Sequence, residues 1–249
     1  TIAVAGKGGT GKTTISAMMI HWIGEHITKS ILAVDADANV NLNDILGISL
    51  NDTIGAIREE MRESIKNIPA GMTKQQFLEY KIQTSLVETP DFDLIAMGRP
   101  EGSGCYCYSN NLLRDILKTL CTNYDFIIID NEAGMEHLSR KINNDIDYLL
   151  IVSDPIVRGI QTAGKISRLV KDLKTKVKEK YLIINRINNP ISQPVLDSIK
   201  IEDLYLLGTI PEDNNLLSQD QQGNPIWPII SKSAAYQALE QMMQKLEIK

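Results

Sequence analysis

The sequence predicts a doubly wound α/β fold, in which a mostly parallel sheet carries helices on both faces. Short apolar runs recur along the chain without strict alternation, as in strands that are buried on both faces. Helical periodicity separates most of these runs, and a glycine-rich turn joins the first run to the first helical segment. The expected strands are 2–5, 31–34, 94–97, 126–129, 148–152, 181–184 and 204–207, and the clearest helices are 13–26, 111–121, 161–171 and 234–246.

The length of 249 residues predicts a single domain, 1–249. The connection 48–90 is far longer than a simple crossover and holds two helical segments around the breaker Ile68-Pro69-Ala70-Gly71. It therefore predicts a helical insertion rather than a second domain. Residues 219–228 contain one glycine and two prolines and predict a surface loop ahead of the last helix.

The composition excludes several classes of protein. With 43% hydrophobic and 23% charged residues, the chain resembles a soluble globular protein. No apolar run approaches the roughly 18 residues needed to cross a bilayer, and the chain opens on a strand, which predicts a cytoplasmic protein with no membrane partner. A net charge of −5 is not typical of a nucleic-acid-binding domain. Three cysteines make no disulfide framework and predict reduced thiols.

A phosphate-binding motif follows the first expected strand. The segment from Gly6 to Thr13 matches G-x-x-x-x-G-K-[ST] and lies between a strand and a helix. Glycines let backbone N–H groups surround phosphates, Lys12 reaches the β/γ oxygens, and the Thr13 hydroxyl ligates Mg²⁺. The residues assigned to the nucleotide here are Gly8, Gly9, Thr10, Gly11, Lys12, Thr13 and Thr14.

A second lysine, Lys7, follows the first glycine of this motif. The run K-G-G-T-G-K-T-T resembles the deviant P-loop of the nitrogenase iron protein, ParA and MinD family, a branch of the P-loop NTPases of the SIMIBI type. The resemblance implies an ATPase in which the early lysine reaches the nucleotide of a partner subunit. Lys7 would then be catalytic in trans, as an arginine finger is. The alternative is a solvated loop lysine.

Two further segments resemble the switches of that family. D-A-D-A-N-V-N at 35–41 aligns with the first switch, where the resemblance implies that Asp37 orients or deprotonates the attacking water. Asp35 and Asn41 belong to the same switch, and Asn41 stands where the iron protein has an aspartate of the magnesium shell. D-N-E-A-G at 130–134 resembles the second switch, in which Asp130 holds Mg²⁺ through water and Gly134 moves with the γ-phosphate. Alternatively, Asp37 and Asp130 are plain helix caps.

Recognition of the base is assigned to the end of strand 181–184. Asn185 and Arg186 directly follow that strand, and related proteins read adenine with an asparagine at this place. Pro211 offers backbone contacts on the other side. Asn185 as the cap of a loop is an equal alternative.

Cys105 and Cys107 lie in an expected loop ahead of a helix that begins near Asn110. In an extended segment, residues i and i+2 point to the same side, so both sulfurs can face one ion. A symmetric dimer would supply four sulfurs at its axis, a set suited to zinc, an iron–sulfur cluster or planar nickel. The alternative is two packed or exposed thiols. Cys121 is predicted to be a core residue.

The combination of a deviant P-loop, a C-x-C loop and a second switch that continues into G-M-E-H-L at 134–138 resembles the CooC and AcsF group. These nickel-insertion ATPases mature carbon monoxide dehydrogenase or acetyl-CoA synthase. The resemblance implies a homodimer that uses ATP and Mg²⁺, binds Ni²⁺ through Cys105 and Cys107 (with Zn²⁺ as the other metal for this site), and serves one of those clients. His137 is a ligand, a sensor or a residue that packs at a helix start.

Two competing functions remain open. An electron-transfer ATPase of the nitrogenase iron protein type would use widely separated cysteines, one of them in the second switch, where this chain has none. A ParA/MinD-like partition or positioning ATPase would bind DNA or membrane. The basic stretch 165–180 binds phosphates, docks an acidic client, or is a solvated helix face. The last helix, with Lys245 as its one basic residue, is a poor membrane anchor.

Overall fold

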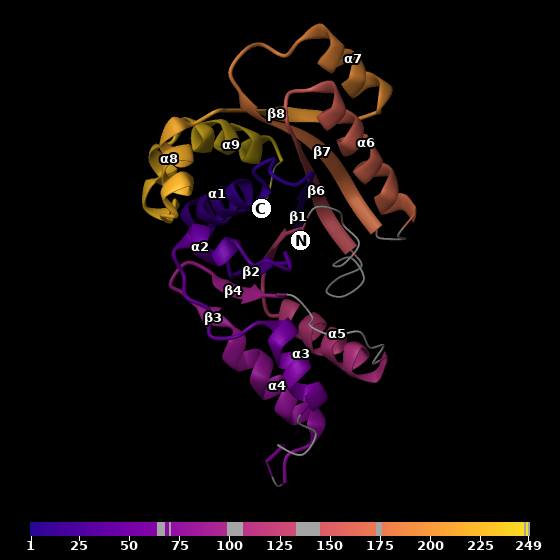
Figure 1. Ribbon diagram of the computed structural model, residues 1–249, viewed down its shortest axis with the longest axis vertical. Coiled ribbons are helices and arrows are strands. Elements are labelled where there is room, and N and C mark those ends of the chain that lie inside the picture. The colour runs from indigo at the N-terminus through magenta and orange to yellow at the C-terminus, as the bar shows by residue number, and fades with distance from the viewer. Residues whose placement is uncertain are drawn as a thin grey trace.

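The computed structural model describes residues 1–63, 68–69, 71–98, 107–132, 145–172, 176–246 and 248. An eight-stranded sheet runs through this part of the chain in the order β3-β4-β2-β5-β1-β6-β7-β8 (Figure 1). Neighbouring strands are parallel except β3, which pairs antiparallel with β4. The strands are β1 Ile2–Gly6, β2 Ile31–Asp35, β3 Val87–Glu88, β4 Asp93–Ala96, β5 Phe126–Asp130, β6 Asp145–Ser153, β7 Lys176–Ile187 and β8 Leu206–Pro211.

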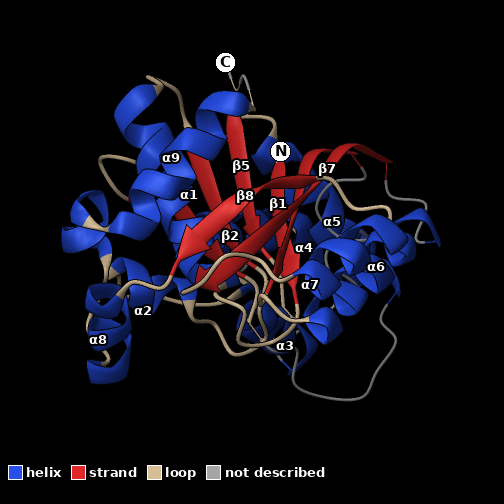
Figure 2. Ribbon diagram, turned by 90° about the horizontal axis from the view of Figure 1, so that it is seen from above, coloured by secondary structure: helices blue, strands red, loops and turns tan. Residues whose placement is uncertain are grey.

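Helices cover both faces of this sheet (Figure 2). One face carries α1 Lys12–His26, α2 Leu42–Leu46, α8 Asn214–Gln222, the 3₁₀ helix η2 Trp227–Lys232 and α9 Ala234–Lys245. The other carries α3 Ile54–Glu63, α4 Lys74–Ser85, α5 Cys107–Cys121, α6 Val157–Asp172 and α7 Gln193–Ile201. The doubly wound α/β prediction is confirmed.

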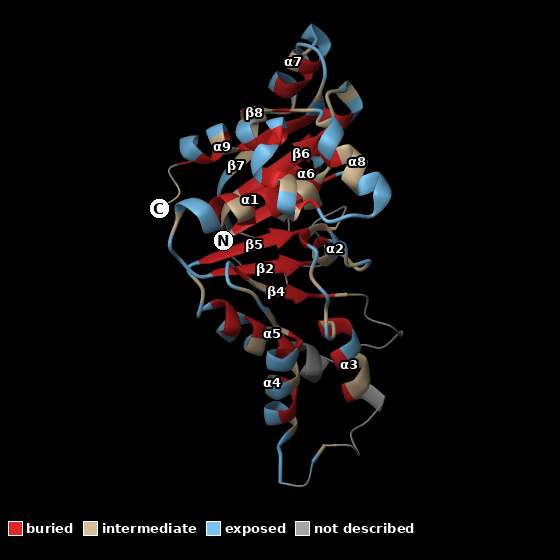
Figure 3. Ribbon diagram, turned by 90° about the vertical axis from the view of Figure 1, so that its left-hand side faces the viewer, coloured by how far each residue is buried: buried red, intermediate tan, exposed pale blue. Residues whose placement is uncertain are grey.

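Each strand supplies both cores, because successive side chains point to opposite faces. Along β1, Ile2 and Val4 pack with α1 and α9, whereas Ala3 and Ala5 pack with the helices of the other face. Every residue of β1, β2 and β5 is buried (Figure 3). This burial on both faces explains why these strands read as continuous apolar runs.

The parallel strands bring their carboxyl ends to one edge of the sheet. The order places β1 between β5 and β6, so the chain turns in opposite directions on either side of β1. In open α/β sheets, ligands bind in the crevice at such a switch point. The phosphate motif and both expected switches begin where β1, β2 and β5 end at this edge. Asn185 and Arg186 lie in the last residues of β7, which continues to Ile187, and not after the strand as predicted.

Several boundaries differ from those predicted. β7 begins at Lys176 because it pairs with β6 from Asp145 onward, so the amino half of β7 is strand despite its charges. The basic stretch is therefore not one helix face: residues 176–180 belong to β7. β8 lies at 206–211 rather than 204–207 and continues through Gly208, where a Cβ would lie 2.8 Å from the Met242 side chain.

The expected loop at 219–228 is wrong in its first part, because α8 continues to Gln222 and ends at Gly223, with φ +67°. α2 and α7 are short helices that were not predicted from the sequence. Within 48–90 the structure holds α3, α4 and the short strand β3. α5 begins at Cys107, three residues before the expected start near Asn110.

We expect Ile151→Ala to lower the free energy of unfolding by about 4 kcal/mol, because Ile151 is fully buried in central strand β6 and the variant leaves a cavity. Urea denaturation measures this change. Ile201→Ala is the matched control: Ile201 is 81% exposed at the end of α7, and its loss should change the free energy by less than about 0.5 kcal/mol. Equal effects for the two variants would contradict this assignment of the core.

Candidate nucleotide-binding site

The phosphate loop connects β1 to α1. At two positions of this loop, the surrounding atoms leave room for glycine only. A Cβ on Gly6 would lie 2.4 Å from the carbonyl oxygen of Val152. Gly11 has φ +89°, and a Cβ there would lie 2.4 Å from Nδ2 of Asn185. α1 begins directly after Gly11, so its free N–H groups and the positive end of its dipole face the loop. The loop has the geometry of a phosphate-binding site.

Lys12 lies inside this loop with an exposed fraction of 8%. Its ammonium lies 3.4 Å from the carbonyl oxygen of Lys7, which also accepts the Thr10 hydroxyl at 2.9 Å. Burial lowers the pKa of Lys12, while the nearby carboxylates of Asp130, Asp37 and Glu132 act in the opposite direction, Asp130 most strongly. Lys12 is thus the buried cation of the site.

The tip of the loop is exposed. Lys7, Gly8 and Gly9 are all exposed to solvent. Thr14, the third residue of α1, is half-buried. A lysine exposed at the tip can reach a second subunit or stay solvated, so both interpretations of Lys7 remain. Its catalytic role in trans stays a prediction.

Asp35 and Asp130 lie side by side, because the register of β2 and β5 pairs these two residues. Burial raises the pKa of the Asp130 carboxyl to about 7, and neighbouring Asp35 adds to the rise. The hydroxyls of Thr13 and Ser16 hydrogen-bond to Asp130 and oppose it, with Ser16 Oγ at 3.0 Å. Ser16 was not predicted, although its place one helical turn after Thr13 puts both hydroxyls on one side of α1.

This group of oxygens fits Mg²⁺. Magnesium prefers hard oxygen ligands and uses few protein groups together with phosphate oxygens. Here a hydroxyl from Thr13 and a carboxylate from Asp130 meet beside a phosphate loop, and a second buried carboxylate, Asp35, lies next to them. Both carboxylates are almost completely buried, so a cation would relieve the cost of burying negative charge.

Asp35 holds the backbone of residues 35–42, which include the predicted first switch. One oxygen accepts the Asp37 N–H at 3.0 Å, and the other accepts the N–H groups of Asn41 and Leu42, both at 2.8 Å. Burial raises the pKa of Asp35, and these three N–H groups oppose the rise. Asp37 remains half-buried and accepts the Asn39 N–H at 2.8 Å. The backbone of the switch is therefore tied to a carboxylate at the end of β2.

Part of the predicted second switch lies outside the described residues. Asp130, Asn131 and Glu132 are described, whereas Gly134 and His137 are not. Asn131 donates both its backbone N–H, at 3.1 Å, and its side-chain amide, at 2.9 Å, to the carbonyl oxygen of Val4. The start of this switch is thus bound to β1, just ahead of the phosphate loop.

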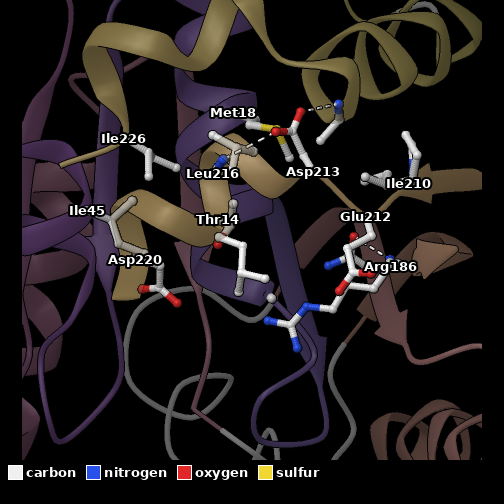
Figure 4. Close-up of a pocket in the computed structure, with 15 residues that line it drawn as sticks. Thr14, Met18, Ile45, Arg186, Ile210, Glu212, Asp213, Leu216, Asp220 and Ile226 are labelled. Atoms are coloured by element: carbon white, nitrogen blue, oxygen red, sulfur yellow. Dashed lines mark hydrogen bonds between the residues drawn. The ribbon is translucent and has the colours of Figure 1, made fainter. Parts of the chain in front are cut away.

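A pocket opens beside the phosphate loop (Figure 4). The pocket lies between the phosphate loop with α1, α2, the end of β7 and the segment 210–235. Its lining residues are Gly11, Thr14, Met18, Ile45, Asn185, Arg186, Ile210, Pro211, Glu212, Asp213, Leu216, Leu217, Asp220, Ile226 and Ala235. The structure therefore brings together the predicted base-reading residues Asn185, Arg186 and Pro211 with Thr14 of the loop.

Asn185 and Arg186 hold the phosphate loop from β7. Asn185 Nδ2 donates to the carbonyl oxygen of Thr10 at 2.8 Å, and its Oδ1 accepts the Arg186 N–H at 2.9 Å. Arg186 has φ +59°, and its guanidinium donates to the carbonyl oxygen of Gly9 at 3.0 Å. Asn185 thus supports the loop, a role that neither sequence-based alternative contained.

The cysteine pair is only partly within the described chain. Cys105 lies outside it, and Cys107 is the first residue of α5, with its side chain also outside it. Because α5 starts at Cys107, this residue is helical and not part of the extended segment that was predicted. Cys121 is buried in the core as predicted, and burial raises the pKa of its thiol to about 11. Among the described residues, no group of three or more His, Cys, Asp and Glu side chains could hold a metal.

Intramolecular partners engage several residues of the basic stretch. Arg168 forms an ion pair of 2.6 Å with Glu202, Lys178 pairs with Asp147, and Lys180 Nζ donates to Ser167 at 3.0 Å. These pairs leave fewer cations for a nucleic acid. In the part of the chain that the structure describes, no helix is both long and apolar enough to cross a membrane.

The fold and this site define a P-loop protein that binds a nucleoside triphosphate at the switch point of its sheet. A family model described as AAA domain matches residues 1–183. The chain is 40% identical over 247 residues to an uncharacterized ATP-binding protein of Methanocaldococcus jannaschii, with 98% of this chain and 97% of that protein covered. The chain therefore belongs to the AAA-domain family and is a P-loop ATP-binding protein.

Two further proteins resemble the chain over most of its length. The carbon monoxide dehydrogenase accessory protein CooC of Rhodospirillum rubrum is 30% identical over 234 residues, covering 89% of this chain and 87% of that protein. The MinD cell division protein of Aquifex aeolicus superposes with a TM-score of 0.69 at 24% identity, covering 98% of this chain and 95% of that one. The second likeness is one of fold.

We expect the nucleotide-free protein to lose stability as the pH rises from about 4 to about 7. Folded Asp130 keeps a proton up to about pH 7, whereas the unfolded chain releases it near 3.8. The folded state thus binds more protons in this window, and the free energy of unfolding falls by up to about 1.4 kcal/mol per pH unit. Urea denaturation across the window should give a shallower slope for Asp130→Asn, while exposed Asp203→Asn keeps the wild-type slope. Equal slopes for the wild type and Asp130→Asn would show that the pKa of Asp130 is not raised in the folded protein.

Proposed function

We propose that this protein hydrolyses ATP as a homodimer, binds nickel through Cys105 and Cys107, and assists nickel insertion into carbon monoxide dehydrogenase or acetyl-CoA synthase. The observation that carries the proposal is the presence, in one chain, of a deviant phosphate loop and a C-x-C motif after β4. The 30% identity to CooC over nearly the whole chain supports it. Nickel is the metal that this cycle delivers, and ATP hydrolysis drives the cycle.

The hydrolytic roles follow from charge and position. Lys12 neutralises phosphate charge from inside the loop, where its low exposure strengthens the interaction. Thr13 and Asp130 would hold Mg²⁺, which supplies further positive charge to the phosphate oxygens. Asp37 orients the attacking water from a switch whose backbone Asp35 holds in place. Lys7, from the loop tip, would complete the site of the other subunit.

The place where the chain leaves β4, ahead of the cysteine motif, supports a coupling of the motif to ATP. β4 runs parallel to β2, so the chain leaves β4 at the same edge of the sheet as the phosphate loop. At that point the Met97 N–H donates to the carbonyl oxygen of Asp35 at 2.7 Å. The segment that leads to Cys105 and Cys107 therefore starts next to the residue that organises the first switch. Two such segments in a dimer would supply four thiolates.

The described surface offers less support for a DNA-binding or membrane-binding ATPase. Arg168, Lys178 and Lys180 have partners within the chain, as described above. The apolar side of α9 is occupied, because Leu239, Met242 and Met243 are buried in the core. An amphipathic membrane anchor would present such a face to lipid.

Lys7→Ala should leave ATP binding largely intact while abolishing ATP-dependent dimerisation and turnover, because the lost ammonium acts on the partner's nucleotide. Sedimentation with and without ATP and a phosphate-release assay measure the two effects. The exposed Lys200→Ala on α7 is the control and should behave as the wild type. Turnover that survives Lys7→Ala would exclude the role in trans.

Cys105→Ser/Cys107→Ser should abolish nickel binding, because hydroxyls are poor ligands for this metal. Metal analysis of the purified dimer should find one nickel shared by two wild-type chains and none in the variant. Cys121→Ser is the matched control and should retain nickel, since Cys121 lies in the core. A four-iron cluster after anaerobic purification would instead favour the electron-transfer alternative, and salt-sensitive DNA retention by the double variant would favour the partition alternative.

A further inference from the structure

One carboxylate, that of Asp213, joins the amino termini of two helices beside the pocket. Its Oδ1 accepts the N–H groups of Asn215 and Leu216 in α8, at 3.0 and 3.2 Å. Its Oδ2 accepts those of Ala234 and Ala235 in α9, at 2.9 and 3.4 Å. In Figure 4 the Asp213 side chain lies between these turns, with a dashed line toward Leu216. Both oxygens are thus occupied by the protein itself.

The position of α8 depends on this link more than that of α9 does. Leu216 is the only buried residue of α8, so apolar packing holds this helix weakly. α9, in contrast, has five buried residues and a cap of its own, in which Ser233 Oγ accepts the Tyr236 N–H at 2.9 Å. Asp213 therefore fastens a weakly packed helix to a firmly packed one.

The other end of α8 is tied to the first-switch side of the site. Beyond Gly223, the Ile226 N–H donates to the carbonyl oxygen of Ile45 in α2 at 2.9 Å, and Pro225 packs against Gly47. α8 is thus held at both ends. Asp213 holds its amino terminus beside α9, and the Ile226–Ile45 hydrogen bond holds the chain that follows its carboxyl terminus.

α8 forms one wall of the pocket. It contributes Leu216, Leu217 and Asp220, and α9 contributes Ala235. The remaining lining includes Gly11, Thr14 and Met18 near the phosphate loop and Asn185 and Arg186 of β7. A planar base in this pocket would be selected by the width of the pocket and by the polar groups on its rim. Because Asp213 binds the first turns of both helices, it fixes the spacing of the residues that α8 and α9 contribute to the pocket.

We propose that Asp213 is a positioning residue that sets the selectivity of the pocket for adenine over other purines. The inference rests on the proposed binding of the nucleobase in this pocket. Asp213 acts through the placement of α8 rather than through contact with the phosphates, and none of its described hydrogen bonds involves Lys12, Asp37 or Asp130. Its removal should therefore affect recognition of the base and spare the chemical step.

Asp213→Asn tests this with a side chain of the same shape. The amide keeps a single acceptor oxygen, so it can cap α8 or α9 but not both, and its NH₂ then faces the N–H groups of the other helix. We expect the KM and Kd for ATP to rise about tenfold, the ATP-to-GTP affinity ratio to fall by a similar factor, and kcat to stay within about twofold. Calorimetric titration with each nucleotide and steady-state kinetics measure these quantities.

Ser233→Ala is the matched control. It removes the separate cap of α9 and a comparable amount of stability, but leaves the Asp213 link intact. It should therefore keep the wild-type ATP-to-GTP ratio. If Asp213→Asn does not fold, Asp213→Ser replaces it, because serine caps α8 and is too short to reach α9, and the same loss of selectivity is expected.

An unchanged ATP-to-GTP ratio in a folded Asp213 variant would overturn the inference, as would an equal loss in Ser233→Ala or a fall in kcat without a rise in KM. A wild type that binds ATP and GTP equally well would also overturn it. If the wild type binds no nucleotide, the proposed ATPase function fails instead, so the two failures are distinguishable.

Discussion

The burial of opposite charges at the carboxyl edge of the sheet is the constraint on which the rest of the site depends. Asp35 is fully buried, Asp130 is 2% exposed, and the register of two parallel strands holds them side by side. Lys12 lies nearby with almost no contact with water. Buried charge is unfavourable unless partners compensate it, so the surrounding loops are arranged to supply hydrogen bonds to these carboxylates.

This compensation links parts of the protein that are distant in sequence. Asp35 is satisfied by backbone N–H groups of the first switch, and its own carbonyl oxygen accepts the N–H at the exit of β4. Asp130 is satisfied by hydroxyls from α1, and Asn131 binds β1. A change of charge at Asp35 or Asp130 therefore acts on the hydrogen bonds that hold both predicted switches and the start of the cysteine segment. In the proposed cycle, this shared neighbourhood couples ATP turnover to the metal site.

The sequence predicted the fold and the phosphate site because both depend on local patterns. Burial on both faces makes β1, β2 and β5 apolar up to the aspartates that end β2 and β5. Phosphate binding requires Gly11, Lys12 and Thr13 in a fixed order. The amino half of β7 was missed because its pairing with β6, and not its own charged residues, makes it a strand. The end of α8 was missed because helix formation there begins at the Asp213 cap, whereas the residues that follow resemble a loop.

The amino-acid sequence by itself determined the class of fold, the phosphate loop with its two lysines, and the acidic residues at two strand ends, since each follows from spacing along the chain. The tertiary structure alone decided that Ser16 supports Asp130, that Asn185 and Arg186 hold the phosphate loop, and that Asp213 joins α8 to α9. Ser16 and Asp130 are 114 residues apart in the chain, and Asn185 and Thr10 are 175 apart. Such contacts leave no periodic pattern, because only the closure of the sheet and the packing of helices on it bring the partners together.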